Sequence, residues 1–260
     1  AYWTLEAREH TDPYPETVEK TAWLLRDAVR RQMVSDVPVC SFLSGGIDSS
    51  VVTALASDYL EEQGGHLHTF SFDFTHNRES FRPNAFQPTQ DRPFVDRVLA
   101  CYPLHHTYLE CEEAELAALL DQAVWMKDLS GMTDVDASLL YFCGQVRRHF
   151  KVALTGECAD EIFGGYPWFY RQDLLHADGF PWSFDLSART ALLNQETISC
   201  LDLEGYVRSR YEAALEEVPH LPGENPEERR RREVAYLNLR WFMQTLLDRM
   251  DRTSMAWGLE

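Results

Sequence analysis

The sequence predicts an α/β fold with a parallel sheet, followed by a C-terminal helical subdomain. Between residues 36 and 166, short apolar runs typical of strands alternate with stretches of helical periodicity. This alternation is typical of βαβ units and a parallel sheet. From about residue 166 onward helical periodicity dominates, notably over 202–218 and 226–250. We therefore expect an α/β core at residues 12–166 and a helical subdomain at 167–260, truncated at its C-terminal end.

The elements of the core follow from apolar spacing and from breaks in it. Apolar residues every three to four positions predict an amphipathic helix over 15–34, and the apolar run 37–43 predicts a strand buried on both faces. A helix follows the break at 44–46, a second strand is predicted over 68–74, and the polar stretch 75–90 is typical of a loop insertion. The remaining elements are a helix near 91–102, a strand at 105–109, helices near 112–126 and 137–149, and a strand at 151–155.

The composition limits the classes of partner. The chain has 260 residues, is 45% apolar and carries a formal net charge of −18. So acidic a surface repels phosphate backbones, and we expect no nucleic acid partner. A magnesium ion and a few amide donors can still hold a triphosphate in an acidic protein. No apolar run approaches the roughly 18 residues that span a bilayer, so we expect no membrane partner.

The six cysteines form no C-x-x-C pair and are too sparse for a disulfide framework. Most of them lie in apolar surroundings, so we expect reduced core thiols in a cytoplasmic protein. The chain starts at an alanine and stops without a helix stop signal, so we also expect it to be part of a longer polypeptide.

Four consecutive arginines at 229–232 are a candidate anion-binding patch. However, Glu227 and Glu228 lie four residues before Arg231 and Arg232, which is the favourable order for ion pairs on a helix surface. We therefore expect a solvated helix face there rather than an anion site.

The strongest functional signal is the sequence Ser-Gly-Gly-Ile-Asp-Ser-Ser at 44–50, between a predicted strand and a predicted helix. Two glycines allow a ligand to approach the backbone closely, and the following helix presents unpaired N–H groups and the positive end of its dipole. These features predict a cradle for a phosphate group. The loop lacks the lysine of a G-x-x-x-x-G-K-S/T loop and carries Asp48 instead. A carboxylate beside phosphates requires a cation between them, so Asp48 predicts magnesium.

The second signal is the Gly-rich stretch 155–166, which also follows a predicted strand. Glu157, Asp160 and Glu161 place three carboxylates within five residues. Strands of one parallel sheet end at the same edge, where ligands bind at the point at which strand order reverses. We therefore expect Asp48 and Asp160 to share a magnesium ion that bridges the phosphates.

These motifs resemble a known family. The S-G-G-I/L-D-S-S loop is similar to the pyrophosphate loop of the N-type ATP pyrophosphatases, which have an adenine nucleotide alpha hydrolase-like core. The G-E-x-x-D-E-x-F-G-G-Y stretch at 156–166 resembles the signature of the glutamine-dependent asparagine synthetase branch. Residues 250–260 resemble the M-x-x-x-S-M-A-x-G-V/L-E segment of that branch. The resemblance covers essentially the whole chain, with the three motifs in the order of the family.

The resemblance implies that ATP and magnesium activate the side-chain carboxylate of aspartate as β-aspartyl-AMP, and that ammonia then displaces AMP to give asparagine. It implies catalytic roles for Asp48, Glu157 and Asp160, with Asp48 and Asp160 as metal ligands and Glu157 as a base near the acyl-adenylate. Phe42 and Phe72 match the strand positions that flank the adenine. The implied ATP- and pyrophosphate-binding residues are Phe42, Leu43, Ser44, Gly45, Gly46, Asp48, Ser49, Ser50, Phe72, Thr155 and Gly156.

The resemblance also implies an N-terminal glutaminase domain in the full-length protein and a phosphate-stabilising lysine beyond Glu260. A homodimer is a further expectation. Two alternatives stay open. One is a recruited amide-forming relative of the β-lactam synthetase or peptide cyclase type, since its acceptor pocket would decide the reaction. The other is a catalytically silent nucleotide-binding domain, against which the intact Asp48, Glu157 and Asp160 argue.

Overall fold

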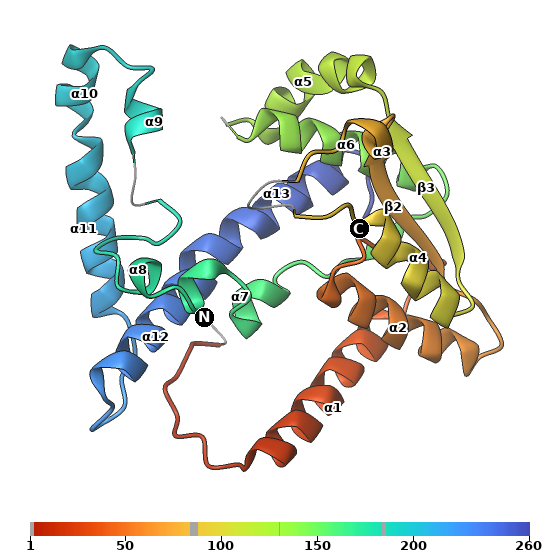
Figure 1. Ribbon diagram of the computed structural model, residues 1–260, viewed down its shortest axis with the longest axis horizontal. Helices are drawn as coiled ribbons and strands as arrows, with labels where there is room; N and C mark the ends of the chain where they lie inside the picture. The colour runs from red at the N-terminus through yellow and green to blue at the C-terminus, as the bar shows by residue number, and fades with distance from the viewer. Residues whose placement is uncertain (1–2, 84–87, 130, 184–185) are drawn as a thin grey trace. The chain divides into compact units, whose positions relative to one another are not determined.

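The computed structural model describes residues 3–83, 88–129, 131–183 and 186–260. The chain divides into two compact units, whose elements are labelled in Figure 1. The α/β unit comprises residues 12–157 and 246–260, and the helical unit comprises residues 158–245 together with the described residues before Asp12. Residues 158–166 thus group with the helical unit and residues 246–260 with the sheet, whereas the domain boundary predicted at 166 stays a prediction.

In the described residues, one sheet of parallel strands runs in the order β3-β2-β1-β4. The strands are β1 (Val39–Phe42), β2 (His68–Phe74), β3 (His105–Cys111) and β4 (Val152–Leu154). In the register of the central strand, Cys40 is opposite His68 on one side and Ala153 on the other. The chain moves outward from β1 to β2 and β3 and then returns to the other side of β1. The strand order therefore reverses between β1 and β4, and the predicted α/β fold is confirmed.

Alternate side chains of β1 face two different layers of helices, as the pleat of a strand requires. Val39 packs in a cluster with residues of α1 (Tyr14–Gln32) and α2 (Ile47–Glu61), and the hydroxyl of Ser41 lies 3.0 Å from that of Thr53 on α2. Cys40 packs instead with residues of α6 (Thr133–Arg147). The sheet therefore has α1 and α2 on one face and α6 on the other.

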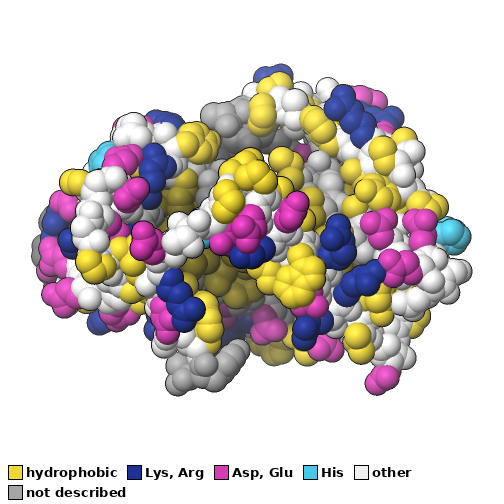
Figure 2. Space-filling view, turned by 90° about the horizontal axis from the view of Figure 1, so that it is seen from below, with side chains coloured by type: hydrophobic (Ala, Val, Ile, Leu, Met, Phe, Trp, Pro, Cys, Tyr) yellow, Lys and Arg dark blue, Asp and Glu magenta, His cyan; other side chains and the backbone are white. Residues whose placement is uncertain are grey.

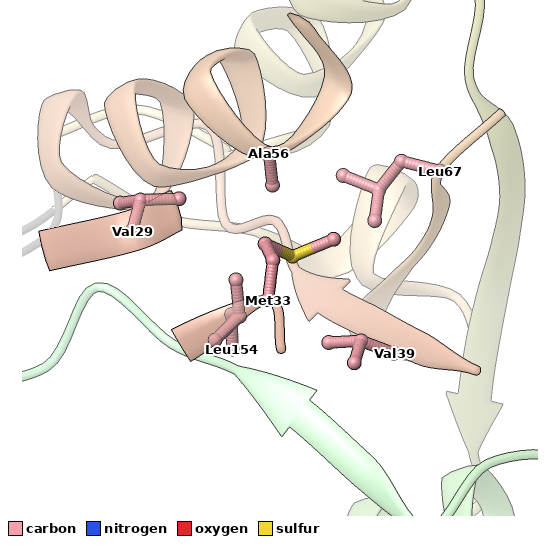
Figure 3. Close-up of a cluster of buried hydrophobic side chains, with 6 residues drawn as sticks. All are labelled: Val29, Met33, Val39, Ala56, Leu67 and Leu154. Carbon is pink, nitrogen blue, oxygen red and sulfur yellow. The ribbon is translucent and has the colours of Figure 1, made fainter. Parts of the chain in front are cut away.

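The core beneath α1 and α2 is shown in Figure 3, where the side chains of six buried residues converge. Leu67 and Ala56 are fully buried there, and Met33 reaches in from the end of α1. Full burial of one leucine side chain stabilises the folded state by about 2 kcal/mol. The six residues are Val29, Met33, Val39, Ala56, Leu67 and Leu154.

The remaining helices of this unit are α3 (Asn77–Ser80), α4 (Arg92–Cys101) and α5 (Glu113–Lys127). The predicted loop at 75–90 therefore contains the short helix α3, and its residues 84–87 lie outside the described residues. Helix α6 begins four residues before its predicted start, because the amide of Asp136 donates to the carbonyl of Met132 and closes a turn there. The chain ends beside β4, where the Glu260 amide donates to the Lys151 carbonyl and the Ala153 amide donates to Glu260, both at 2.8 Å.

The helical unit contains no strand among its described residues, as predicted. Its longer helices begin at side-chain caps: Asp202 caps α11 and Asn225 caps α12. Each side chain accepts a hydrogen bond from the backbone amide three residues later. The π-helical turn at 238–242 joins α12 to α13, so the predicted helix at 226–250 is continuous but irregular. The elements are α7 (Ala159–Phe163), a 3-10 turn (Pro167–Phe169), α8 (Gln172–Leu175), α9 (Ser187–Thr190), α10 (Gln195–Leu201), α11 (Leu203–Glu216), α12 (Pro226–Leu237), the π-helix (Asn238–Phe242) and α13 (Met243–Met255), whose residues from Leu246 onward belong to the α/β unit.

The arginine run at 229–232 forms only in part the solvated face that we expected. Arg231 pairs with Glu227 at 3.0 Å as predicted, but Arg232 pairs with Glu224 at 2.8 Å rather than with Glu228. Arg230 is wrongly predicted as a surface residue. Its guanidinium is largely buried and donates to the carbonyls of Leu175, the last residue of α8, and Ala177, just beyond it. These partners could not be found from local spacing.

The cysteines and the surface complete the description. All six cysteines are free, and Cys40, Cys111 and Cys143 are buried as expected, whereas Cys101 and Cys200 are exposed. On the face seen in Figure 2, acidic and basic side chains are interspersed rather than gathered into one basic area. Among the helices of the described residues, none has both the length and the apolar character needed to span a membrane.

His106 on β3 links the stability of the α/β unit to pH. Its Nδ1 lies 2.8 Å from the hydroxyl of Thr69 on the neighbouring strand. Burial, followed by the charge of nearby His68, lowers the pKa of His106 to about 4; Asp96 opposes this shift and Arg92 adds to it. The folded state therefore disfavours the protonated ring.

We predict that the neutral His106 ring contributes to the free energy of unfolding fully above about pH 6.5. This contribution is lost as the pH falls to about 4, because only the unfolded histidine takes up a proton in that range. The expected loss is about 1 to 2 kcal/mol, roughly half the unscreened value, since the ring is partly exposed. Urea titrations across this pH range should show that the free energy of unfolding depends less on pH in His106→Gln than in the original protein. His66→Gln, at an exposed position, should keep the original dependence, and an unchanged slope in His106→Gln would contradict the assignment.

Candidate active site

The loop after β1 is held in a tight turn against the start of α4. Gly45 has a φ of +81°, in the left-handed region that favours glycine. A Cβ at this position would lie 2.8 Å from the Cβ of Phe94 and 2.9 Å from the backbone nitrogen of Val95. Only glycine therefore fits here without a shift of α4.

Serine hydroxyls fix the rest of this loop. The hydroxyls of Ser44 and Ser49 lie 2.9 Å apart, and the Ser44 amide donates to the Ser49 hydroxyl at 3.2 Å. Ser50 donates its hydroxyl to the carbonyl of Gly46 at 2.6 Å. Within the described chain no side chain caps the N-terminus of α2, where Asp48 is the second residue. The first amides of α2 and the end of its dipole are therefore oriented to bind an anion.

The loop after β4 touches the first loop at the switch point. A Cβ on Gly156 would lie 2.6 Å from the backbone nitrogen of Ser49 and 2.8 Å from the carbonyl carbon of Asp48. The hydroxyl of Thr155 accepts a hydrogen bond from the Glu157 amide at 3.3 Å. Residues 44–49 and 155–157 lie at the same edge of the sheet, and their backbones are in direct contact. The rest of the second motif, from residue 158 onward, belongs to the helical unit, so its predicted place at this edge stays a prediction.

A cavity of about 350 Å³ adjoins the loop after β1. Its apolar wall includes Phe42, Phe72 and Phe142, and the rings of Phe42 and Phe142 meet edge to face with centroids 4.6 Å apart. Leu43 and Ser44 also line the cavity, so its lining continues from the aromatic residues into the serine- and glycine-rich loop. A flat apolar ring beside an anion-binding loop is the arrangement that a nucleotide requires, and the volume lies within the range of small-ligand sites, roughly 300–1,000 Å³.

Polar residues from β2, β3 and the start of α4 also line this cavity, and we call them its polar wall. Arg92 lies with its guanidinium carbon 3.9 Å from the ring centroid of Tyr108 and donates to Glu110 at 3.0 Å. Burial and a hydrogen bond to Asp96 raise the pKa of Tyr108 to about 12, so its hydroxyl stays a donor at neutral pH. The same wall contains Asp73 and Asp91.

Glu157 has a cationic neighbour on α13. The Arg249 guanidinium donates to its carboxylate at 3.2 Å, and both side chains are about three-quarters buried. Among the described residues, the buried Nε of Arg249 has no hydrogen-bond partner. The pair therefore places a carboxylate and a cation in a partly desolvated setting directly after Gly156.

The predicted site residues fall into three groups in the α/β unit, and Asp160 lies in the helical unit. Asp48 belongs to the α/β unit and Asp160 to the helical unit, so a magnesium ion shared by the two is a prediction from the motifs rather than from a distance. In the described residues no three metal-binding side chains are gathered for an ion. Phe42, Leu43, Ser44 and Phe72 line the cavity; Gly45, Gly46, Asp48, Ser49 and Ser50 form the loop and the start of α2; and Thr155, Gly156 and Glu157 follow β4.

Our sequence predictions missed four residues of this region. Asp91, Arg92 and Tyr108 lie in segments that we expected to be only a helix start and a strand. Arg249 lies in a segment whose composition predicts only a helix of mixed charge, 92 residues away from Glu157. One signal was present for the first two, because an acidic residue directly before the helix that leads to β3 is followed by a basic residue at its first position.

We predict that Gly156→Ala separates the two loops, since the added methyl group meets rigid backbone. We expect a loss of about 2 kcal/mol or more in the free energy of unfolding, together with loss of nucleotide binding. Gly65→Ala is the matched control, because its Cβ would find ordinary contacts at 3.6 Å. Chemical denaturation and calorimetric titration with ATP measure both effects. A Gly156→Ala protein as stable and as competent in binding as the control would show that the contact is unimportant.

Comparison with known proteins agrees with this arrangement. The sequence profile described as asparagine synthase matches residues 20–260. Asparagine synthetase (glutamine-hydrolyzing) 3 of Bacillus subtilis (strain 168) is 46% identical over 260 residues, which are all of this chain and 42% of that protein. Putative asparagine synthetase (glutamine-hydrolyzing) 2 of Methanocaldococcus jannaschii is 29% identical over 184 residues, 70% of this chain and 32% of that protein.

A fungal relative bears a different name. Amidase chyE of Penicillium rubens is 32% identical over 193 residues, covering 70% of this chain and 28% of that protein. The chain thus spans less than half the length of each of these relatives. With the family profile covering nearly all of it, and with both loops of the switch point inside the match, the chain belongs to the asparagine synthase family.

Proposed function

We propose that this chain is the synthetase part of a glutamine-dependent asparagine synthetase. The observation that carries the proposal is the contact between the Ser-Gly-Gly loop and the loop at 155–157, beside an aromatic cavity of nucleotide size. The relative that matches the whole chain is named asparagine synthetase (glutamine-hydrolyzing), which supports the same reading. The substrates are then ATP, aspartate and ammonia.

The chemistry explains why a nucleotide site is needed. A carboxylate is a poor electrophile because it carries negative charge and has no good leaving group. Attack by the aspartate side-chain oxygen on the α-phosphorus breaks the bond to pyrophosphate and forms an acyl-adenylate. Ammonia then adds to the acyl carbon, loses one proton, and expels AMP. The loop at 44–50 holds the pyrophosphate through amides and serine hydroxyls, so that charge leaving the α-phosphorus is stabilised.

Asp48 and Asp160 are proposed to hold magnesium, which would offset the charge of the phosphates. Magnesium in such sites is usually bound by one or two carboxylates, with phosphate oxygens and water completing its shell. The two carboxylates would otherwise repel the nucleotide, so they need the cation.

Glu157 is proposed to accept a proton from the attacking ammonia. Its neighbour Arg249 holds the carboxylate in one orientation by the contact at 3.2 Å. A positioned carboxylate near the reacting group typically accelerates a proton transfer by roughly 10²- to 10⁴-fold.

The partners and the location follow only from the proposed activity. A glutaminase domain elsewhere in the full-length protein would supply ammonia from glutamine, a homodimer would be its assembly, and the cytoplasm its compartment. An ATP–pyrophosphate exchange assay on the full-length protein, run with aspartate and with other carboxylates, separates the possibilities. Exchange that depends on aspartate supports asparagine synthesis; dependence on another acid indicates a recruited amide-forming enzyme, and no exchange with any acid indicates a silent domain.

We predict that Asp48→Asn and Asp160→Asn each lower aspartate-dependent pyrophosphate exchange by roughly 100-fold or more, because each removes charge that holds the cation. Thermal unfolding should change little in both variants. Asp58→Asn, at an exposed position on the same helix as Asp48, is the control and should exchange normally. Near-normal exchange by either variant would remove that residue from the metal site.

We predict a different defect for Glu157→Gln. Pyrophosphate exchange should stay within about threefold of the original protein, while asparagine formation from free ammonia falls roughly 100-fold, since only the second step needs the base. Glu19→Gln, on the exposed surface of α1, controls for loss of one negative charge. Parallel losses of exchange and amide formation would instead make Glu157 a ligand on the phosphate side.

A further inference from the structure

Asp91 occupies a specific place between the two ends of the cavity. It is the residue directly before α4, and it lines the polar wall of the cavity. Its carbonyl oxygen lies 3.0 Å from the point that a Cβ on Gly45 would occupy. Asp91 is therefore adjacent to the phosphate-binding loop and faces the space in front of the aromatic wall.

The other charged groups of this wall already have partners. Asp73 accepts hydrogen bonds from the side-chain amide of Asn77 at 2.7 Å and from the Phe74 amide at 2.9 Å. Its second oxygen lies 4.0 Å from the guanidinium of Arg92, which also pairs with Glu110. These contacts fix Asp73 and Arg92 as parts of the wall.

The carboxylate of Asp91 has no hydrogen-bond donor among the described residues. Although it stands at the N-cap position of α4, its side chain does not cap that helix. Partial desolvation and the nearby Asp73 carboxylate raise the pKa of Asp91, although the residue as a whole is exposed. Its carboxylate is therefore open to the cavity, and the hydroxyl groups of a ligand can donate to it in place of water.

The geometry of a nucleotide identifies these hydroxyl groups. The ribose joins the base to the phosphates, so with the base against Phe42 and Phe72 and the phosphates in the loop at 44–50, the sugar adjoins Asp91. A carboxylate accepts hydrogen bonds from both members of a vicinal diol, as acidic residues do at other nucleotide sites. We propose that Asp91 accepts the 2′- and 3′-hydroxyls of the ribose, so that the site selects ribonucleotides over 2′-deoxyribonucleotides. This inference rests on the proposed nucleotide-binding function.

The test is a cycle of two ligands and two proteins, measured by calorimetric titration of the full-length protein with magnesium present. The original protein should bind ATP roughly tenfold or more tightly than 2′-deoxyATP, as expected for hydrogen bonds to a charged acceptor. In Asp91→Ala this ratio should fall to about one, because only the affinity for ATP depends on the hydroxyl contact. Asp91→Asn, which keeps an acceptor oxygen, should give an intermediate ratio.

Asp121→Asn, on the exposed surface of α5, loses the same charge outside the cavity and should keep the original ratio. Equal binding of ATP and 2′-deoxyATP by the original protein would overturn the inference, as would an equal loss of both affinities in Asp91→Ala. Purine riboside triphosphate, which lacks the 6-amino group, tests whether Asp91 binds the base instead. If Asp91→Ala removed the preference for ATP over purine riboside triphosphate but kept the preference for ATP over 2′-deoxyATP, the ribose assignment would be wrong. If the original protein bound no nucleotide at all, the proposed function itself would fail.

Discussion

The close approach of Gly156 to the first turn of α2 is the contact on which the candidate site depends. A glycine there lets the loop after β4 lie against the backbone of Asp48 and Ser49, where any Cβ would come within 3 Å. The contact exists because β1 and β4 are adjacent parallel strands that end at the same edge. It joins the loop that carries Asp48 to the loop that carries Glu157, so the groups that we propose for the phosphate side and the acyl side are brought together by close backbone packing.

A second packing contact extends the candidate site into the aromatic cavity. Gly45 allows the start of α4 to lie against the serine-rich loop, and this brings Asp91 and Arg92 into the wall of the aromatic cavity. The aromatic wall itself follows from the pleat of the sheet. Phe42 and Phe72 point toward α6, whose Phe142 meets them edge to face. The close contact at Gly45 and the layer formed by α6 thus account for two sides of the cavity lining.

The sheet and its loops could be predicted from local sequence because their signals are local. The strand at 68–74 has the predicted bounds, since its apolar residues are flanked by clear breaks. Long-range partners could not be predicted in this way. Arg249 approaches Glu157 from 92 residues away, and Arg230 binds carbonyls more than 50 residues before it, so neither spacing nor composition indicates these contacts. Asp91 was missed for a related reason, because its importance depends on what packs against Gly45.

The pairing of Glu260 with β4 has a consequence for solubility. Among the described strands, β4 has three residues and lies at one edge of the sheet, where unpaired N–H and C=O groups can pair with strands of other molecules. The backbone of Glu260 occupies two of these groups, on Lys151 and Ala153, while the side chain of Leu259 is buried in the adjoining core. The segment after α13 therefore acts as a cover for the sheet edge, and a protein without it would expose a short template for edge-to-edge aggregation.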